Sequence, residues 1–126
     1  MKKEVSEAVE NYLETILVLS KKKPDLHAID ICDELGYSRP TVSVVVKQMK
    51  GNGLITVDEY NHIALTERGR AIAEGIYERH NIISEFFMEI GVSRETALED
   101  ACKIEHDISE ETFLCIKKHI QSIRGE

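Results

Sequence analysis

Three side chains that commonly bind transition metals lie close together near the C-terminal end of the sequence. Cys102 is followed by Glu105 and His106, at spacings of three and four residues. On an α-helix, side chains at these spacings lie on one face within a turn of each other. A thiol, a carboxylate and an imidazole that converge in this way indicate part of a transition-metal site. The alternative is a solvated helix face with a packed cysteine.

Three further polar residues are candidates for the same chemistry. His80 falls near the middle of a predicted long helix, within the polar run Glu78–Asn81. Asn11 and Glu14 stand three residues apart on the first predicted helix, beside its apolar stripe. The alternatives are a surface histidine at residue 80 and simple solvation of the other two.

A second pattern, over residues 28–49, predicts a helix-turn-helix. A short helix ends at Gly36, and Ser38 offers its hydroxyl as the N-cap of a second helix that runs to about Lys50. The first residues of such a helix can reach base edges in the DNA major groove, and a lysine one turn further on can meet phosphate. The candidates are Ser38, Arg39, Pro40, Thr41, Ser43 and Lys47. The alternative is a helical hairpin whose valines only fill a core.

Two β-prone runs, residues 54–57 and 62–65, flank the polar turn 58–61 and predict a hairpin, the wing of a winged helix. Tyr60, Asn61 and His62 could touch the DNA backbone or the minor groove. Periodic apolar residues predict further helices over 5–20 and 66–90, and after the N-caps at residues 93 and 109. The long helix should bury Ile72, Ile76, Ile83, Phe87 and Ile90, and the last helix Phe113, Ile116, Ile120 and Ile123.

The net charge of −7 is distributed unevenly along the 126 residues. Residues 1–70 carry a net charge of −1 and residues 71–126 carry −6, while no acid occurs between Leu35 and Val57. A locally basic strip can bind DNA because phosphate neutralisation is decided at the contact surface. The excess carboxylate of the second half would be relieved by a bound cation.

The composition, with 42% hydrophobic residues, supports a folded core, and no apolar run is long enough to span a membrane. The N-terminus is charged and unlike a signal peptide, and three cysteines fit a reducing compartment better than a disulfide scaffold. We therefore expect a cytoplasmic protein without membrane contact.

The order of four segments resembles the diphtheria-toxin-repressor and manganese-transport-regulator family, over about residues 7–123. The segments are Asn11-Tyr12-Leu13-Glu14, Ser38-Arg39-Pro40-Thr41-Val42-Ser43, Arg79-His80 and Ala101-Cys102-Lys103-Ile104-Glu105-His106. The resemblance implies a mainly α fold, in which an N-terminal winged helix-turn-helix with a small β-hairpin wing precedes a helical dimerisation domain. The expected domains are 1–70 for DNA binding and 71–126 for metal binding and dimerisation, with helix 66–90 shared. The short form, without an SH3-like third domain, is expected.

The same resemblance implies a homodimeric repressor of metal-uptake genes that binds a palindromic double-stranded operator when Fe(II) or Mn(II) binds between the two domains. Its implied ligands are Asn11, Glu14, His80, Cys102, Glu105 and His106. Asn11, which would offer its amide oxygen, stands where the family usually has methionine or aspartate. Cys102 resembles the iron-responsive branch and Glu14 the manganese branch. Thiolate and imidazole favour Fe(II), Co(II) or Zn(II) over Mn(II), whereas carboxylates favour Mn(II). Among these metals the prediction leans to iron, and other divalent transition metals are expected to bind in vitro.

Two other functions are compatible with parts of the sequence. A metal-independent winged-helix regulator would sense an organic ligand in an apolar pocket among Tyr77, Phe86, Phe87 and Met88. A small zinc enzyme would use His80 and Cys102 with Glu105 or His106 as ligands, but no separate base is evident and the helix-turn-helix would have no purpose. The prediction is therefore a regulator and not an enzyme.

Overall fold

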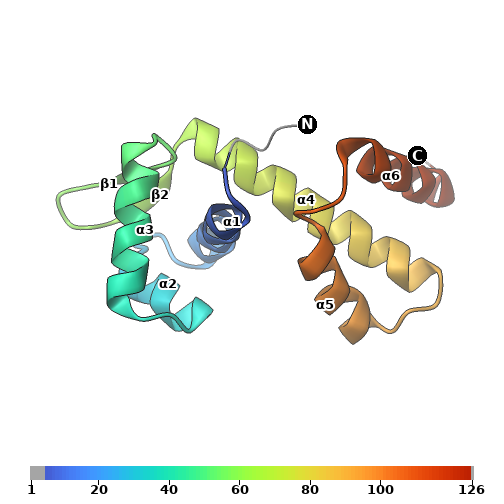
Figure 1. Ribbon diagram of the computed structural model, residues 1–126, viewed down its shortest axis with the longest axis horizontal. Coiled ribbons are helices and arrows are strands. Elements are labelled where there is room, and N and C mark those ends of the chain that lie inside the picture. The colour runs from blue at the N-terminus through green and yellow to red at the C-terminus, as the bar shows by residue number, and fades with distance from the viewer. Residues whose placement is uncertain (1–4, 126) are drawn as a thin grey trace. The chain divides into compact units, whose positions relative to one another are not determined.

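The computed structural model describes residues 5–125, which form six helices and one hairpin (Figure 1). In chain order the elements are α1 (Glu7–Lys22), α2 (Ala28–Leu35), α3 (Arg39–Gly51), β1 (Ile55–Val57), β2 (Ile63–Leu65), α4 (Glu67–Glu89), α5 (Arg94–Ile104) and α6 (Glu110–Arg124). The chain divides into two compact units, a first unit over residues 5–74 and a second unit from residue 75 onward, and α4 contributes to both. The mainly helical fold with a winged helix-turn-helix is confirmed.

The helix-turn-helix of the first unit follows from local capping. Gly36 adopts a left-handed backbone with φ of 72°, which ends α2 at little steric cost. The Ser38 hydroxyl then accepts a hydrogen bond from the Thr41 N–H at 3.4 Å, and proline occupies the first turn of α3. These contacts turn the chain sharply between α2 and α3.

The hairpin is short, and its tip is organised by one carboxylate. β1 and β2 pair antiparallel, with Thr56 opposite Ala64. Asp58 accepts hydrogen bonds from the N–H groups of Tyr60 and His62, at 2.8 and 2.9 Å. The backbone N–H of His62 contributes most to lowering the pKa of the Asp58 carboxyl. At the base, the Ile63 N–H donates to the Leu26 carbonyl oxygen at 2.8 Å, which ties the hairpin to the chain just before α2.

The core of the first unit combines one apolar face from each helix with the inner side of the hairpin. Its fully buried side chains include Leu13, Ile16, Leu17, Leu26, Ile31, Val42, Met49, Leu54 and Ile55. The start of α4 packs so closely on this core that a Cβ at Gly69 would overlap the Leu54 carbonyl oxygen. Only glycine fits there.

The second unit has its own core, made by the later part of α4 with α5 and α6. Its buried residues are Ile82, Ile83, Ala101, Phe113 and Ile120. The predicted stripes were wrong at their ends, because Ile90 and Ile123 are 62% and 48% exposed. Ile90 lies just beyond the end of α4, and Ile123 lies in the last turn of α6. None of the helices in residues 5–125 is long and apolar enough to cross a membrane.

Candidate metal centre and nucleic-acid interface

The end of α5 places the three clustered candidates. Cys102 lies in the regular helix, which ends at Ile104, and Glu105 is the C-cap with helical backbone angles of −58° and −25°. The Glu105 N–H still donates to the Ala101 carbonyl oxygen at 2.9 Å. The helical spacing therefore persists through Glu105, although the regular helix ends earlier than predicted.

His80, on α4, meets Cys102 and Glu105 in the second unit. The ligand atoms of these three residues all lie within 4.8 Å of one another. His80 Nδ1 is 2.8 Å from Glu105 Oε2 and 3.7 Å from Cys102 Sγ. The second carboxylate oxygen, Glu105 Oε1, lies 3.4 Å from His106 Nε2. The carboxylate thus stands between two imidazoles, with the thiol beside one of them.

This cluster is not a solvated helix face. Glu105 and His106 are only 1% and 2% exposed, and His80 is half-buried. Cys102 is the exposed member, and it provides the side from which the cluster can be reached. Because burying an ionised carboxylate is costly unless it is paired, positive charge close by would stabilise the charged form of Glu105. Protonated histidine or a metal ion can supply that charge.

Arg79 holds the turn that carries the cluster, a role that the sequence did not reveal. Its Nη1 donates to the carbonyl oxygens of Glu105 and Ile108, at 3.2 and 3.0 Å. Its guanidinium also lies 5.1 Å from the centre of the Phe113 ring. The carbonyl oxygens at the two ends of the turn after α5 thus have a donor, and this turn is fixed to α4.

The donor set suits a divalent transition metal. Imidazole nitrogen, thiolate sulfur and carboxylate oxygen bind such ions at about 2.0–2.3 Å, so two donors of one ion lie at most roughly 4.6 Å apart. Small side-chain shifts would bring the donors of His80, Cys102 and Glu105 to a common ion. Asn11, which is exposed, and Glu14, which is half-buried, lie on α1 in the first unit. They stay predictions as metal ligands.

The candidate DNA-binding residues of α3 share one outer face. All six predicted residues, Ser38, Arg39, Pro40, Thr41, Ser43 and Lys47, are exposed. Val42 and Met49, on the opposite face, are fully buried. This amphipathic arrangement is compatible with both a DNA-binding helix and a helical hairpin that fills a core. One face of α3 is buried in the core, and the other is available to a partner. Tyr60 and Asn61 are exposed at the wing tip.

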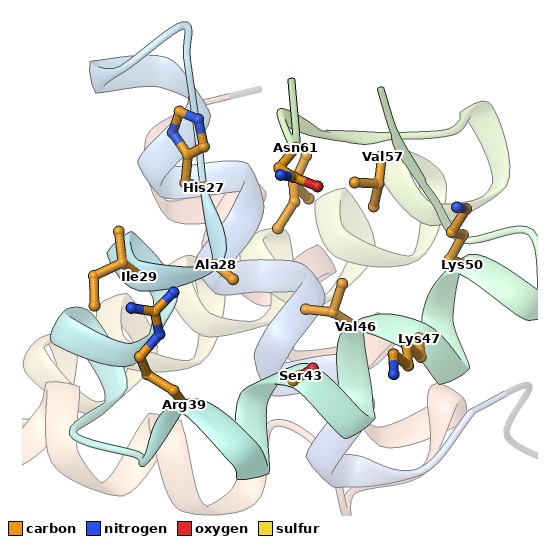
Figure 2. A pocket seen from close by; sticks show the side chains of 11 residues that line it. His27, Ala28, Ile29, Arg39, Ser43, Val46, Lys47, Lys50, Val57 and Asn61 are labelled. Carbon is orange, nitrogen blue, oxygen red and sulfur yellow. The ribbon is translucent and has the colours of Figure 1, made fainter. Parts of the chain in front are cut away.

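A groove of about 450 Å³ lies between the start of α2, the outer face of α3 and the hairpin (Figure 2). We call it the wing groove. It is lined by His27, Ala28, Ile29, Arg39, Ser43, Val46, Lys47, Lys50, Val57, Asn61 and Ile63. Three of these residues are permanent cations, and none of the described lining residues is Asp or Glu. His27 and Lys50 were not predicted as binding residues. Lys50 could have been found from its spacing to Lys47, whereas His27 joins the groove only through the fold.

Two of the four residues proposed for an organic-ligand pocket pack within the second unit. Phe86 and Phe87 pack against the buried core of the second unit. Phe86 also contacts the His119 ring edge-on, with ring centres 5.9 Å apart. Part of the apolar surface that such a ligand would need is therefore used within the protein.

A winged helix-turn-helix followed by a helical unit with a His–Cys–Glu cluster defines the class of metal-dependent transcription regulators. Residues 4–63 match the N-terminal DNA binding domain of the iron dependent repressors, and residues 66–124 match their metal binding and dimerisation domain. The chain belongs to the iron dependent repressor family.

Individual relatives agree with this assignment. The chain is 36% identical over 107 residues to the transcriptional regulator MntR of Escherichia coli, covering 85% of this chain and 69% of that protein. It is 34% identical over 109 residues to the iron-dependent repressor IdeR of Mycobacterium tuberculosis, covering 86% of this chain and 47% of IdeR. The solved structure of the manganese regulator SloR superposes with a TM-score of 0.78 at 26% identity, covering 90% of this chain and 53% of SloR. The chain thus spans about half the length of IdeR and SloR.

Proposed function

We propose that this protein is a metal-responsive transcription regulator, not an enzyme, that represses genes by binding a palindromic DNA operator as a homodimer. Fe(II) or Mn(II) is the activating ion. The observation that carries the proposal is the buried Glu105 carboxylate between two imidazoles, 2.8 Å from His80 and 3.4 Å from His106, with Cys102 beside them. Relatives named for iron and for manganese support both ions.

The proposed ligands of the second unit are His80, Cys102, Glu105 and His106. Glu14 and Asn11 of α1 would complete the set from the first unit, as the family resemblance implies. If Glu14 and Glu105 both bind one divalent ion, the ion would supply the positive charge that offsets repulsion between their carboxylates. Ligands from α1 would then link the DNA-binding residues to the cluster.

The two family matches support separate roles for the two domains. Residues 1–70 would bind DNA, and residues 71–126 would bind metal and form the dimer, with α4 shared between them. Two α3 helices must be held about 34–36 Å apart to enter successive major grooves. Ligation that links the two units would favour that spacing, and a coupling of only about 1–3 kcal/mol changes DNA affinity roughly 5–150-fold.

Thiolate and imidazole ligands favour Fe(II) over Mn(II), whereas carboxylates suit Mn(II). With Cys102 and two histidines in the set, iron is the preferred ion. Comparing the two metals in DNA-binding titrations, with Fe(II) kept anaerobic, would rank them directly.

The proposal is tested with Glu105→Ala and His106→Ala. Each substitution should abolish the metal-stimulated part of DNA binding while the dimer persists, because the candidate DNA contacts lie on α3 and the hairpin and both substituted side chains are buried. DNA binding is measured by electrophoretic mobility and the dimer by sedimentation. Unchanged metal dependence in both variants would remove this cluster from the mechanism.

A further inference from the structure

The residues that line the wing groove are suited to bind the backbone of one DNA strand. Arg39, Lys47 and Lys50 provide its positive charge, and Val46, Val57 and Ile63 provide apolar surface. Phosphate groups and the apolar faces of deoxyribose alternate along a DNA strand, so a groove with both kinds of lining fits that strand. Figure 2 shows side chains of α3 along one side of the groove, and His27 and Asn61 on the other.

His27 differs from the other cationic candidates in the groove because its charge can change near neutral pH. It is half-buried at the N-cap of α2, where its backbone N–H donates to Asp30 Oδ2 at 2.8 Å. Asp30 is already paired with Lys23 at 2.8 Å. The Asp30 carboxylate is thus largely neutralised by another cation.

The ring of His27 lies against that of a second histidine, His62, which does not line the groove. The two rings meet edge-on, with centres 4.8 Å apart, and His62 Nδ1 lies 3.1 Å from Asp58 Oδ2. An imidazolium at His27 would share the groove with the positive charges of Arg39, Lys47 and Lys50. Only an added anion in the groove would offset the repulsion between these charges.

We propose that His27 is a phosphate ligand that binds DNA as the imidazolium, so that DNA binding takes up a proton. The inference rests on the proposed function and names a residue and a pH dependence for its DNA contact. Neutral imidazole offers one N–H donor, whereas imidazolium offers two donors and a charge. DNA affinity therefore rises as the solution is acidified from about pH 8 to about pH 6.

The test compares wild type with His27→Gln, which cannot be protonated, and His27→Arg, which is always charged. The probe is a fluorescent duplex of about 30 base pairs, selected from a random pool in the presence of Mn(II) and long enough for two half-sites. At about pH 6 wild type should bind roughly tenfold more tightly per subunit than His27→Gln. The affinity of His27→Gln should also depend less steeply on salt. Its slope of log affinity against log salt should be shallower than that of wild type by about 0.9 per lost phosphate contact. At about pH 8 both differences should vanish, and His27→Arg should bind there as wild type does at about pH 6.

The controls separate this inference from the function on which it rests. Acid also weakens metal binding by protonating the ligands, so the metal is kept saturating at each pH. His119→Gln removes an exposed histidine on α6 and should leave the pH profile unchanged. If wild type binds the duplex in a metal-dependent way but His27→Gln has the same pH and salt profiles, the role of His27 is refuted and the proposed function stands. If wild type does not bind the duplex in the presence of any metal, both the role of His27 and the proposed function are refuted.

Discussion

Replacing Glu105 with glutamine tests the metal centre with little disturbance of the packing. The side chain is 1% exposed, and its two oxygens lie 2.8 Å from His80 Nδ1 and 3.4 Å from His106 Nε2. Glutamine has nearly the same shape and keeps one acceptor, but it loses the negative charge that attracts a divalent ion. The variant should fold and should bind metal weakly.

The size of the effect follows from linkage. A metal present at about 100 times its dissociation constant stabilises the folded state by about 2.7 kcal/mol. For a chain of this length, that corresponds to a rise in Tm of roughly 10 °C. Removing a ligand should weaken binding by about 100-fold or more. At the same metal concentration only about 0.4 kcal/mol then remains, a rise of about 1–2 °C.

The assay is a thermal melt followed by circular dichroism, with chelator, with Mn(II) and with anaerobic Fe(II). Glu99→Gln is the matched control, because it removes an exposed carboxylate from the same helix, α5. The control should keep the full metal-induced rise in Tm. If Glu105→Gln also keeps it, Glu105 is not a ligand and the reasoning from its burial and its two imidazole neighbours is wrong.

Three further predictions concern residues that stabilise the two units through packing, hydrogen bonds or an ion pair. Gly69→Ala should lower the free energy of unfolding by about 1–3 kcal/mol in urea titrations, because its Cβ would overlap the Leu54 carbonyl oxygen. Arg79→Met should cost about 1–3 kcal/mol in the same assay by leaving two carbonyls without a donor, and it should weaken metal binding in calorimetric titrations. The hydrogen bond from Lys23 is the main cause that lowers the pKa of Asp30, so Asp30 stabilises the fold above its unfolded pKa and loses this contribution as acid titrates it. Asp30→Asn should therefore lower Tm at about pH 7 and have little effect at about pH 2.

Each of these predictions has a contrary result. A Gly69→Ala protein as stable as wild type would mean that α4 can move away from residue 54 at no cost. Unchanged metal affinity in Arg79→Met would separate the turn after α5 from the metal centre. An equal loss of Tm at both pH values would show that Asp30 acts through packing and not through its charge.

The helix-turn-helix could be predicted from sequence because its determinants are local. Gly36 and Ser38 define the turn and the cap through contacts within a few residues, and the acid-free strip marks the outer face of α3. The spacing of Cys102 and Glu105 likewise fixes their common face, since the helical geometry continues through the C-cap.

The environment of the metal centre could not be predicted in the same way. Glu105 and His106 lie off the apolar stripe of their own helix, and that pattern predicts exposure rather than the nearly complete burial observed. Burial depends on the tertiary packing around the turn after α5, including the hydrogen bonds that Arg79 donates to its carbonyl oxygens. His27 is similar, because the hairpin that brings His62 against it lies more than thirty residues further along the chain.

The central claim is that a divalent ion at this cluster switches on DNA binding, and one titration tests it most directly. The selected duplex is titrated with wild type by fluorescence anisotropy in Fe(II), in Mn(II) and in chelator, and chelator is then added to the preformed complex. We expect the affinity for DNA to be about 5–150-fold higher with metal and to fall again on chelation. Equal affinity in all three solutions would contradict it.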